Sequence, residues 1–157
     1  MATWGYTATA PGAIAVSGAP VRVISRVIDY SLFTVGSTDV VQALVVPDNH
    51  AVMLAGVEVL TADTAAASGT VALGTFSGIA SGGYVAAAAP TTLGQMVPVT
   101  VPAGGFVNEG TGTGDTIDIT HATGTINAKL RVWAVVIDLT KLPSSANSVV
   151  PVSGTSI

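Results

Sequence analysis

The chain has 157 residues, of which 9% are charged and 49% hydrophobic, with a net charge of −4, a pI near 4.7 and no cysteine. One domain of this length can be stable without cross-links, and the lack of cysteine excludes disulfides and thiolate metal sites. Five basic residues are too few for the dense basic surface of a nucleic-acid-binding protein, and glycines and prolines interrupt the apolar runs before they reach the length of a membrane-spanning helix.

The first twenty residues, MATWGYTATAPGAIAVSGAP, are rich in Ala, Gly, Thr and Pro and carry neither charge nor a clear hydrophobic period. They lack the basic start and the sustained apolar core of a signal peptide. We expect residues 1–20 to form an extended N-terminal arm.

Residues 21–142 alternate apolar runs with turn signals, show no helical period and are expected to form one domain. Turn residues are concentrated at Gly36–Asp39 and Pro47–Asn49. The expected strands are Val21–Val35, Val40–Val46, Val52–Thr61, Gly69–Phe76, Gln95–Val101, Thr116–Thr120 and Lys129–Leu139. A helix is the competing interpretation of Val52–Thr61, against which its β-branched residues and flanking turns weigh. Ser77–Thr92 is expected to be a loop in which Ala86–Ala89 could form one helical turn.

This succession of strands predicts an all-β fold, a jelly-roll-like antiparallel β-sandwich with extended N- and C-terminal arms. The second arm is residues 143–157, which are small, polar and uncharged.

The last strand, Lys129–Leu139, gives the strongest pattern in the chain. Leu130, Val132, Ala134 and Val136 share one face, and Lys129, Arg131, Trp133, Val135 and Ile137 share the other. We expect Trp133 to be buried, as an anchor in the core or in an interface. Asp138 falls on the Leu130–Val136 face, so it either pairs with Arg22 or Arg26 or marks where the strand leaves the core.

The sequence contains no recognisable arrangement of catalytic residues. Nucleophilic catalysis needs a base beside the nucleophile, and the two histidines, His50 and His121, are expected to be exposed in or next to turns. The motif Gly110–Asp115 (GTGTGD) lacks the Gly-Lys-Ser/Thr ending of a phosphate-binding loop and is expected to be a flexible turn. We therefore predict no catalytic residue, no cofactor and no enzymatic activity.

Four oxygen-bearing side chains lie close together in the sequence: Asn108, Glu109, Asp115 and Asp118. Calcium is bound by six to eight oxygens, often from such loops, but the regular Asp-x-Asp-x-Asp-Gly spacing is missing. Solvated turn carboxylates are the favoured interpretation, and we predict no metal site.

The arrangement STDVVQALVVPDNHAVMLAGVEVLTAD (Ser37–Asp63), GTVALGTF (Gly69–Phe76) and GDTIDIT…AKLRVWAVVIDL (Gly114–Leu139) resembles that of small structural proteins of tailed phages, which include capsid decoration (cement) proteins with jelly-roll domains. The resemblance implies a β-sandwich on the outer capsid surface of the virion. It also implies binding to the major capsid protein, a trimeric state and a role in clamping neighbouring capsomers. It brings no catalytic residues.

Low charge also favours a homo-oligomer, because typical soluble domains carry about 25% charged residues. No nucleic-acid or membrane partner is expected. The alternative function is a phage tail protein or a receptor- or carbohydrate-binding β-sandwich. A sugar site needs exposed aromatic side chains, for which the candidates are Trp4, Tyr6, Tyr30, Tyr84 and Trp133.

Overall fold

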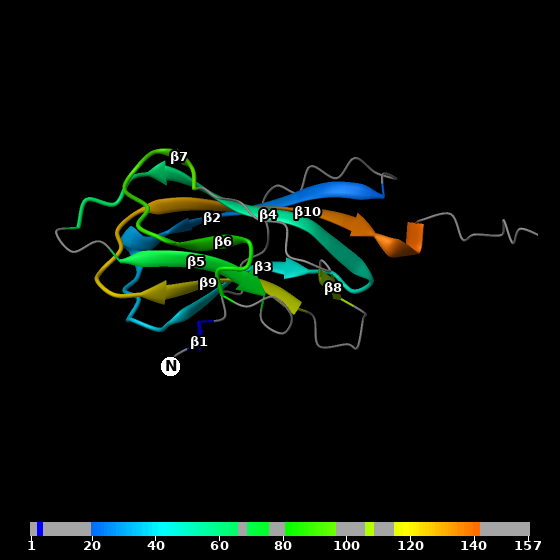
Figure 1. Ribbon diagram of the computed structural model, residues 1–157, viewed down its shortest axis with the longest axis horizontal. Helices are drawn as coiled ribbons and strands as arrows, with labels where there is room; N and C mark the ends of the chain where they lie inside the picture. The colour runs from blue at the N-terminus through cyan, green and yellow to red at the C-terminus, as the bar shows by residue number, and fades with distance from the viewer. Residues whose placement is uncertain are drawn as a thin grey trace, which may run out of the picture.

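Two β-sheets packed face to face make up the computed structural model of the protein (Figure 1). The structure describes residues 3–4 (backbone only), 20–65, 69–75, 81–96, 106–108 and 115–141. We call the two layers sheet A and sheet B. Their packing confirms the predicted all-β sandwich.

Sheet A has the strand order β1-β3-β9-β5-β6. Its strands are β1 (Thr3–Trp4), β3 (Val40–Val46), β9 (Asp115–Ala122), β5 (Thr70–Thr75) and β6 (Val85–Ala88). Every pairing in this sheet is antiparallel except that of β1, which runs parallel to β3 with Thr3 opposite Val40. Thr3 and Trp4 thus pair with the first two residues of β3 at its outer edge.

Sheet B consists of β2 (Val21–Asp29), β10 (Lys129–Asp138) and β4 (His50–Thr61), in that order. Two short strands, β7 (Gly94–Gln95) and β8 (Phe106–Asn108), pair with opposite ends of the far edge of β4. Short 3₁₀ helices follow β2 and β10 as η1 (Tyr30–Leu32) and η2 (Leu139–Lys141). Each sheet draws neighbouring strands from the two ends of the chain, β2 beside β10 and β3 beside β9, which is the strand order of a jelly roll.

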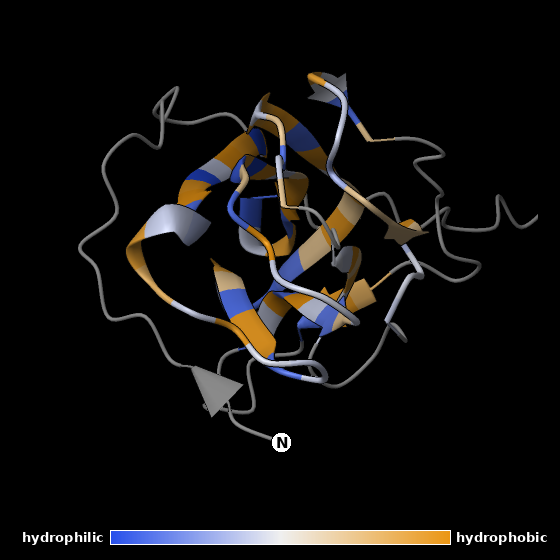
Figure 2. Ribbon diagram, turned by 90° about the vertical axis from the view of Figure 1, so that its left-hand side faces the viewer, coloured by the Kyte–Doolittle hydropathy of each residue, from blue (hydrophilic) through white to orange (hydrophobic). Residues whose placement is uncertain are grey.

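The core lies between the sheets and results from the two-residue alternation of the strands (Figure 2). In β10, Leu130, Val132, Ala134 and Val136 are fully buried, while the residues between them are partly exposed. The predicted inner face of this strand is therefore confirmed. Ile117 and Ile119 of β9 and Leu73 of β5 close the core from sheet A.

Most predicted strands are present, with ends that differ by a few residues. Val52–Thr61 lies within strand β4 and is not a helix. The first strand ends at Asp29 rather than Val35, because Asp29 caps η1 by accepting hydrogen bonds from the backbone N and Oγ of Ser31. Of the expected strand Gln95–Val101, the described part contains Gln95 in β7, and residues 97–101 lie outside the described residues.

Two strands were not predicted, and one of them lies in an expected loop. Val85–Ala88 was expected in a loop with one helical turn but forms β6, which pairs with β5. Phe106–Asn108 was not predicted as a strand but forms β8. In both cases a neighbouring strand offers hydrogen bonds that local sequence preference does not reveal.

The turns predicted at Gly36–Asp39 and Pro47–Asn49 are present, whereas residues 110–114 of the turn predicted at Gly110–Asp115 lie outside the described residues. Pro47–Asn49 connects sheet A to sheet B, and Asn49 has a φ of 56°, a left-handed conformation that asparagine tolerates. In the Gly36–Asp39 turn, the Gly36 N–H donates to Asp39 Oδ2 at 2.8 Å.

Apart from residues 3–4 and Pro20, the two predicted arms lie outside the described residues. The boundaries 1–20, 21–142 and 143–157 stay predictions. In the described ranges, no helix is long and apolar enough to cross a membrane.

Candidate interaction surface

The two histidines are buried, which corrects the expectation of exposed turn residues. His50 is 6% exposed and His121 is 3% exposed. His50 Nε2 lies 2.8 Å from Arg22 Nη2, and its Nδ1 lies 2.8 Å from the carbonyl oxygen of Asp48. A guanidinium has only donors, so Nε2 accepts and Nδ1 carries the proton. The neutral ring thereby joins β2 to the turn before β4.

His121 has a similar structural role at the end of β9. Its Nδ1 donates to the carbonyl oxygen of Asp39 at 3.1 Å, and its Nε2 accepts from the Tyr30 hydroxyl at 2.8 Å. Burial lowers the pKa of His121 and raises that of Tyr30. Among the described residues, both histidine rings thus form their hydrogen bonds with groups other than a serine hydroxyl.

Asp138 sits where β10 leaves the core, as one of the two alternatives expected. Its Oδ1 accepts from the Thr140 hydroxyl at 2.6 Å, and its Oδ2 lies 3.6 Å from Lys141 Nζ and 4.0 Å from His50 Nε2. The Thr140 hydrogen bond is the main reason that its pKa is lowered. Arg22 contacts His50 Nε2, the same atom that lies 4.0 Å from this carboxylate.

The structure describes three of the four oxygen-bearing residues of the metal hypothesis. Asn108, on sheet B, donates its amide to the carbonyl oxygen of Val46 at 2.9 Å. Asp115 and Asp118 lie on β9 of sheet A, and Glu109 is outside the described residues. No group of three or more His, Asp or Glu side chains is placed to hold a metal within the ranges that the structure describes.

Asp118 is the exceptional carboxylate of this set. It lies on the outer face of sheet A, opposite Gln42 of β3 and Gly74 of β5, yet it is only 5% exposed. Its Oδ1 is buried without a hydrogen-bond partner. Burial is the main cause that raises the pKa of Asp118 to about 6, and the nearby charge of Asp115 adds to it. The side chain of Thr116 acts in the opposite direction. Sequence patterning places Asp118 on the outer face but does not predict this burial.

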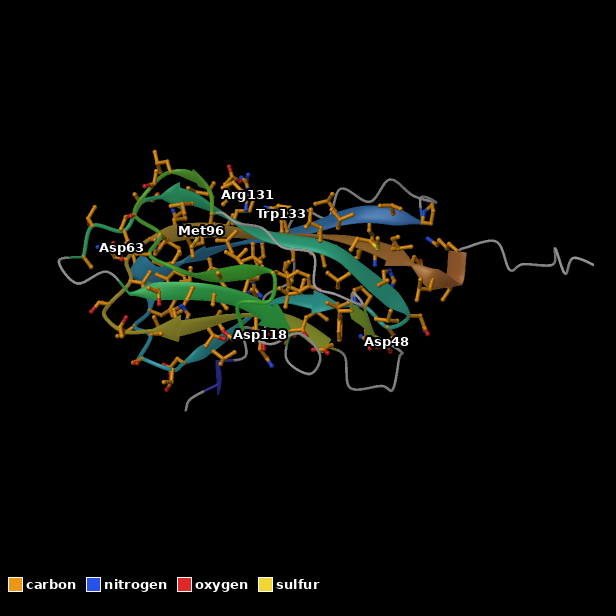
Figure 3. All side chains as sticks on the ribbon, in the orientation of Figure 1. Asp48, Asp63, Met96, Asp118, Arg131 and Trp133 are labelled. Atoms are coloured by element: carbon orange, nitrogen blue, oxygen red, sulfur yellow. The ribbon has the colours of Figure 1, made fainter. Side chains whose placement is uncertain are left out.

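The outer face of sheet B carries a different kind of surface. Arg131 and Trp133 project from β10 on the side facing away from sheet A, and Asp118 lies on the opposite side of the molecule (Figure 3). At one end of this face, Lys129 Nζ pairs with Asp29 Oδ2 at 2.7 Å and Arg131 Nη1 pairs with Glu58 Oε2 at 2.8 Å. The hydrogen bond from Lys129 is the main cause that lowers the pKa of Asp29 to about 2.

Trp133 lies in the middle of the face and is half-buried, so it is not an anchor in the core, and its role as an interface anchor stays a prediction. Its indole lies over Gly56 of β4, where an added Cβ would be 2.5 Å from Trp133 Cζ2. The indole Nε1–H donates to Gln95 Oε1 at 3.0 Å, and Gln95 Nε2 donates to the carbonyl oxygen of Val57 at 2.8 Å. Trp133 thus holds β7 against sheet B.

Beyond Trp133 the face becomes apolar. We define the apolar patch as the outward-facing residues of four adjacent strands at this end: Val21 and Val23 of β2, Val135 and Ile137 of β10, Ala51 and Leu54 of β4, and Val107 of β8. Val21 is 48% exposed, Val23 55% and Val107 44%. An antiparallel sheet usually presents polar side chains to solvent, so such a patch indicates an interaction surface.

Two of the aromatic side chains considered for a sugar-binding site are buried. Tyr30 and Tyr84 are 2% and 0% exposed and belong to the core. Tyr6 lies outside the described residues, as does the side chain of Trp4. Trp133 remains partly exposed, and its cross-strand neighbours on the outer face, Ser25 of β2 and Gly56 of β4, are not aromatic.

Comparison with known proteins identifies the fold. No protein family and no curated protein matches the sequence. A chain in the solved structure of the capsid of Ralstonia phage GP4 is similar in structure, with a TM-score of 0.54 and 15% identity over 85% of this chain and 91% of that chain. A second chain, from the acidic stable capsid structure of Helicobacter pylori bacteriophage KHP30, has a TM-score of 0.49 and 10% identity over 82% of this chain and 92% of that one. The likeness to the GP4 chain shows that the jelly-roll fold is shared.

Proposed function

We propose that the chain is a structural protein of a phage virion, a capsid decoration (cement) protein. In this role it binds the major capsid protein on the outer capsid surface and clamps neighbouring capsomers. It acts as a homo-oligomer, which we expect to be a trimer.

The fold shared with a chain of the GP4 capsid, over most of both chains, is the observation that carries this proposal. A shared fold is compatible with many functions, so the rest of the molecule has to agree with the role. The phage-like sequence arrangement from Ser37 to Leu139 agrees, because its segments form β3, β4, β5, β9 and β10, the main strands of both sheets.

The polar side chains of the described residues also agree with a structural role. Their hydrogen bonds hold strands and turns in place: His121 joins β9 to η1, and Asn108 joins β8 to the end of β3. On sheet B, the exposed side chains include several large apolar ones, Val21, Val23, Val27 and Met53. A protein that works by contact with other subunits requires this distribution.

The clamp itself is assigned to the two arms, residues 1–20 and 143–157. Both are uncharged and contain Ala, Val, Ile and Pro, which suit an extended segment lying on a neighbour's surface. The pairing of Thr3–Trp4 with β3 supports this assignment, since it shows that the N-terminal segment can add to a sheet edge.

Co-sedimentation with decoration-free shells of the parent phage tests the function. The intact chain is expected to bind and saturate at a fixed ratio to the major capsid protein. Variants lacking residues 1–19 or 144–157 should keep the melting temperature of the domain, while at least one binds shells more weakly. The absence of binding by the intact chain would contradict the function, and undiminished binding by both deletions would contradict the clamping role of the arms.

A further inference from the structure

We propose that the apolar patch on the outer face of sheet B is covered by a second copy of this chain. The inference deepens the homo-oligomeric part of the proposed function and rests on it. It specifies which surface of the subunit makes the contact.

The two outer faces of the sandwich differ in a way that the fold does not require. On sheet A, the central strands present small or polar side chains to the outside, among them Gln42, Thr116 and Thr120, with Val45 as the large exposed exception. On sheet B, Val21, Val23 and Val107 are exposed together with the partly buried Val135 and Ile137. A contiguous apolar surface of this kind is unfavourable in water and becomes favourable when another molecule covers it.

The patch is built on the most extensively paired strands of the molecule. β10 pairs with β2 in unbroken register from Lys129 to Ile137, and with β4 over the whole strand. Val135 lies opposite Val23 on one side and Leu54 on the other, so the side chains form a fixed row across the sheet. Little conformational entropy is lost when a partner docks on such a rigid surface.

Charge identifies the partner. The charged residues on this face, Lys129, Arg131, Asp29 and Glu58, form two ion pairs and leave the face neutral. The other three basic and seven acidic residues carry the whole net charge of −4. Two copies repel each other least when they meet through this face, because its two ion pairs leave it without net charge. A strongly charged partner would find no complementary charge here.

The free edge of sheet B is a less suitable contact. Among the described residues, β2 pairs on one side, with β10. Its Arg22 and Arg26 lie on the face turned toward sheet A, opposite the buried Val136 and Val132. Inward-pointing charges on an edge strand are a known means of preventing edge-to-edge pairing. Association through the face of the sheet is therefore favoured over extension of its edge.

Matched valine-to-glutamate variants test the interface. Val23→Glu places a charge in the patch at a residue that is 55% exposed, so the fold should tolerate it, and Val45→Glu places the same charge on sheet A at a residue that is 67% exposed. Sedimentation equilibrium of the purified chains at micromolar concentration gives the mass. Wild type and Val45→Glu should be oligomers, whereas Val23→Glu should have the mass of one 15.5 kDa chain or dissociate at least tenfold more readily. Val21→Glu is the second patch variant if Val23→Glu fails to fold by circular dichroism.

Three results would overturn the proposal. They are a monomeric wild type, an unchanged mass for the folded patch variant, and equal dissociation of Val45→Glu. Shell binding separates the interface from the function. An oligomeric wild type that ignores shells would contradict the capsid role and leave the interface standing. A patch variant that keeps its mass but no longer binds shells would assign the patch to the shell instead of a second copy.

Discussion

Gly56 determines how Trp133 packs on sheet B. The indole fits because Gly56 has no side chain, and an added Cβ would lie 2.5 Å from Trp133 Cζ2 and 2.8 Å from Gln95 Nε2. Gly56→Ala should therefore displace the indole and break its hydrogen bond to Gln95. Overpacking of this kind costs about 1–3 kcal/mol. Urea unfolding should show the loss of stability, and tryptophan fluorescence should report the changed surroundings of the ring.

A double-mutant cycle provides the control for this prediction. In a Trp133→Ala background the space above residue 56 is vacant, so Gly56→Ala should cost much less than in the wild-type background. An equal cost in both backgrounds would show that the clash with Trp133 is not the cause. Trp133→Ala alone should cost less than the roughly 3–5 kcal/mol of a fully buried aromatic, because the side chain is half-buried.

Asp118 makes the stability of the fold depend on pH. Its pKa is raised from 3.8 to about 6 in the folded protein, so between these values the folded state keeps a proton that the unfolded state has released. The contribution of Asp118 to the free energy of unfolding is therefore greatest below pH 3.8 and decreases as the pH rises to about 6. Asp118→Asn should remove this loss, and the variant should be more stable than wild type at pH 7 by about 3 kcal/mol.

Thermal or urea unfolding of both chains between pH 4 and pH 8 checks this expectation. The difference between the two curves isolates Asp118 from the other titrating groups. A constant difference across this range would contradict the assigned burial of the charge. An increase in the stability of the wild type relative to Asp118→Asn as the pH rises would also contradict it.

At the scale of single residues, the sequence predicts the face of the strand on which a side chain lies better than it predicts the neighbours of that side chain. The alternation from Lys129 to Ile137 assigns these residues to the correct faces, because the side-chain period of a strand is fixed. It does not reveal that Trp133 meets a glycine, or that His50 and His121 are buried. Those properties depend on residues far away in the sequence, such as Arg22 for His50 and Tyr30 for His121.

At the scale of elements, long apolar runs are predicted and short additions are missed. β3, β4, β5, β9 and β10 have β-branched or alternating sequences that favour strands in isolation. The sequence of β6, VAAA, has no such preference, and it becomes a strand because β5 offers a free edge. β8 is three residues long and is held by the Asn108 amide on the Val46 carbonyl oxygen. Neither the edge nor this hydrogen bond is visible in the local pattern.

The candidate interaction surface combines these elements. Sequence alternation predicts which residues of β10 face outward, but the patch also needs Val107 from β8 and Leu54 from β4. The β-bulge between Val135 and Val136 sets which residue of β4 lies beside the patch. Strand pairing therefore converts separate short runs into one surface, which the sequence pattern alone cannot show.

At the scale of the whole molecule, the low charged fraction and the arrangement of the two faces have one explanation. A free-standing domain needs polar outer faces on both sheets, whereas this chain has a neutral apolar face on sheet B and uncharged arms. In a subunit of a larger assembly, such apolar surfaces are not exposed to water, because they become buried when the subunit assembles. The resemblance in sequence and the jelly-roll fold both agree with a virion as that assembly.

Electron cryomicroscopy of the parent phage distinguishes the proposed capsid role from a role in the tail. Jelly-roll density that matches the two sheets described above is expected at many equivalent positions on the outer surface of the capsid, in contact with the major capsid protein. Density for this chain at the tail alone, or no such density on the outer surface of the head, would contradict the proposed function.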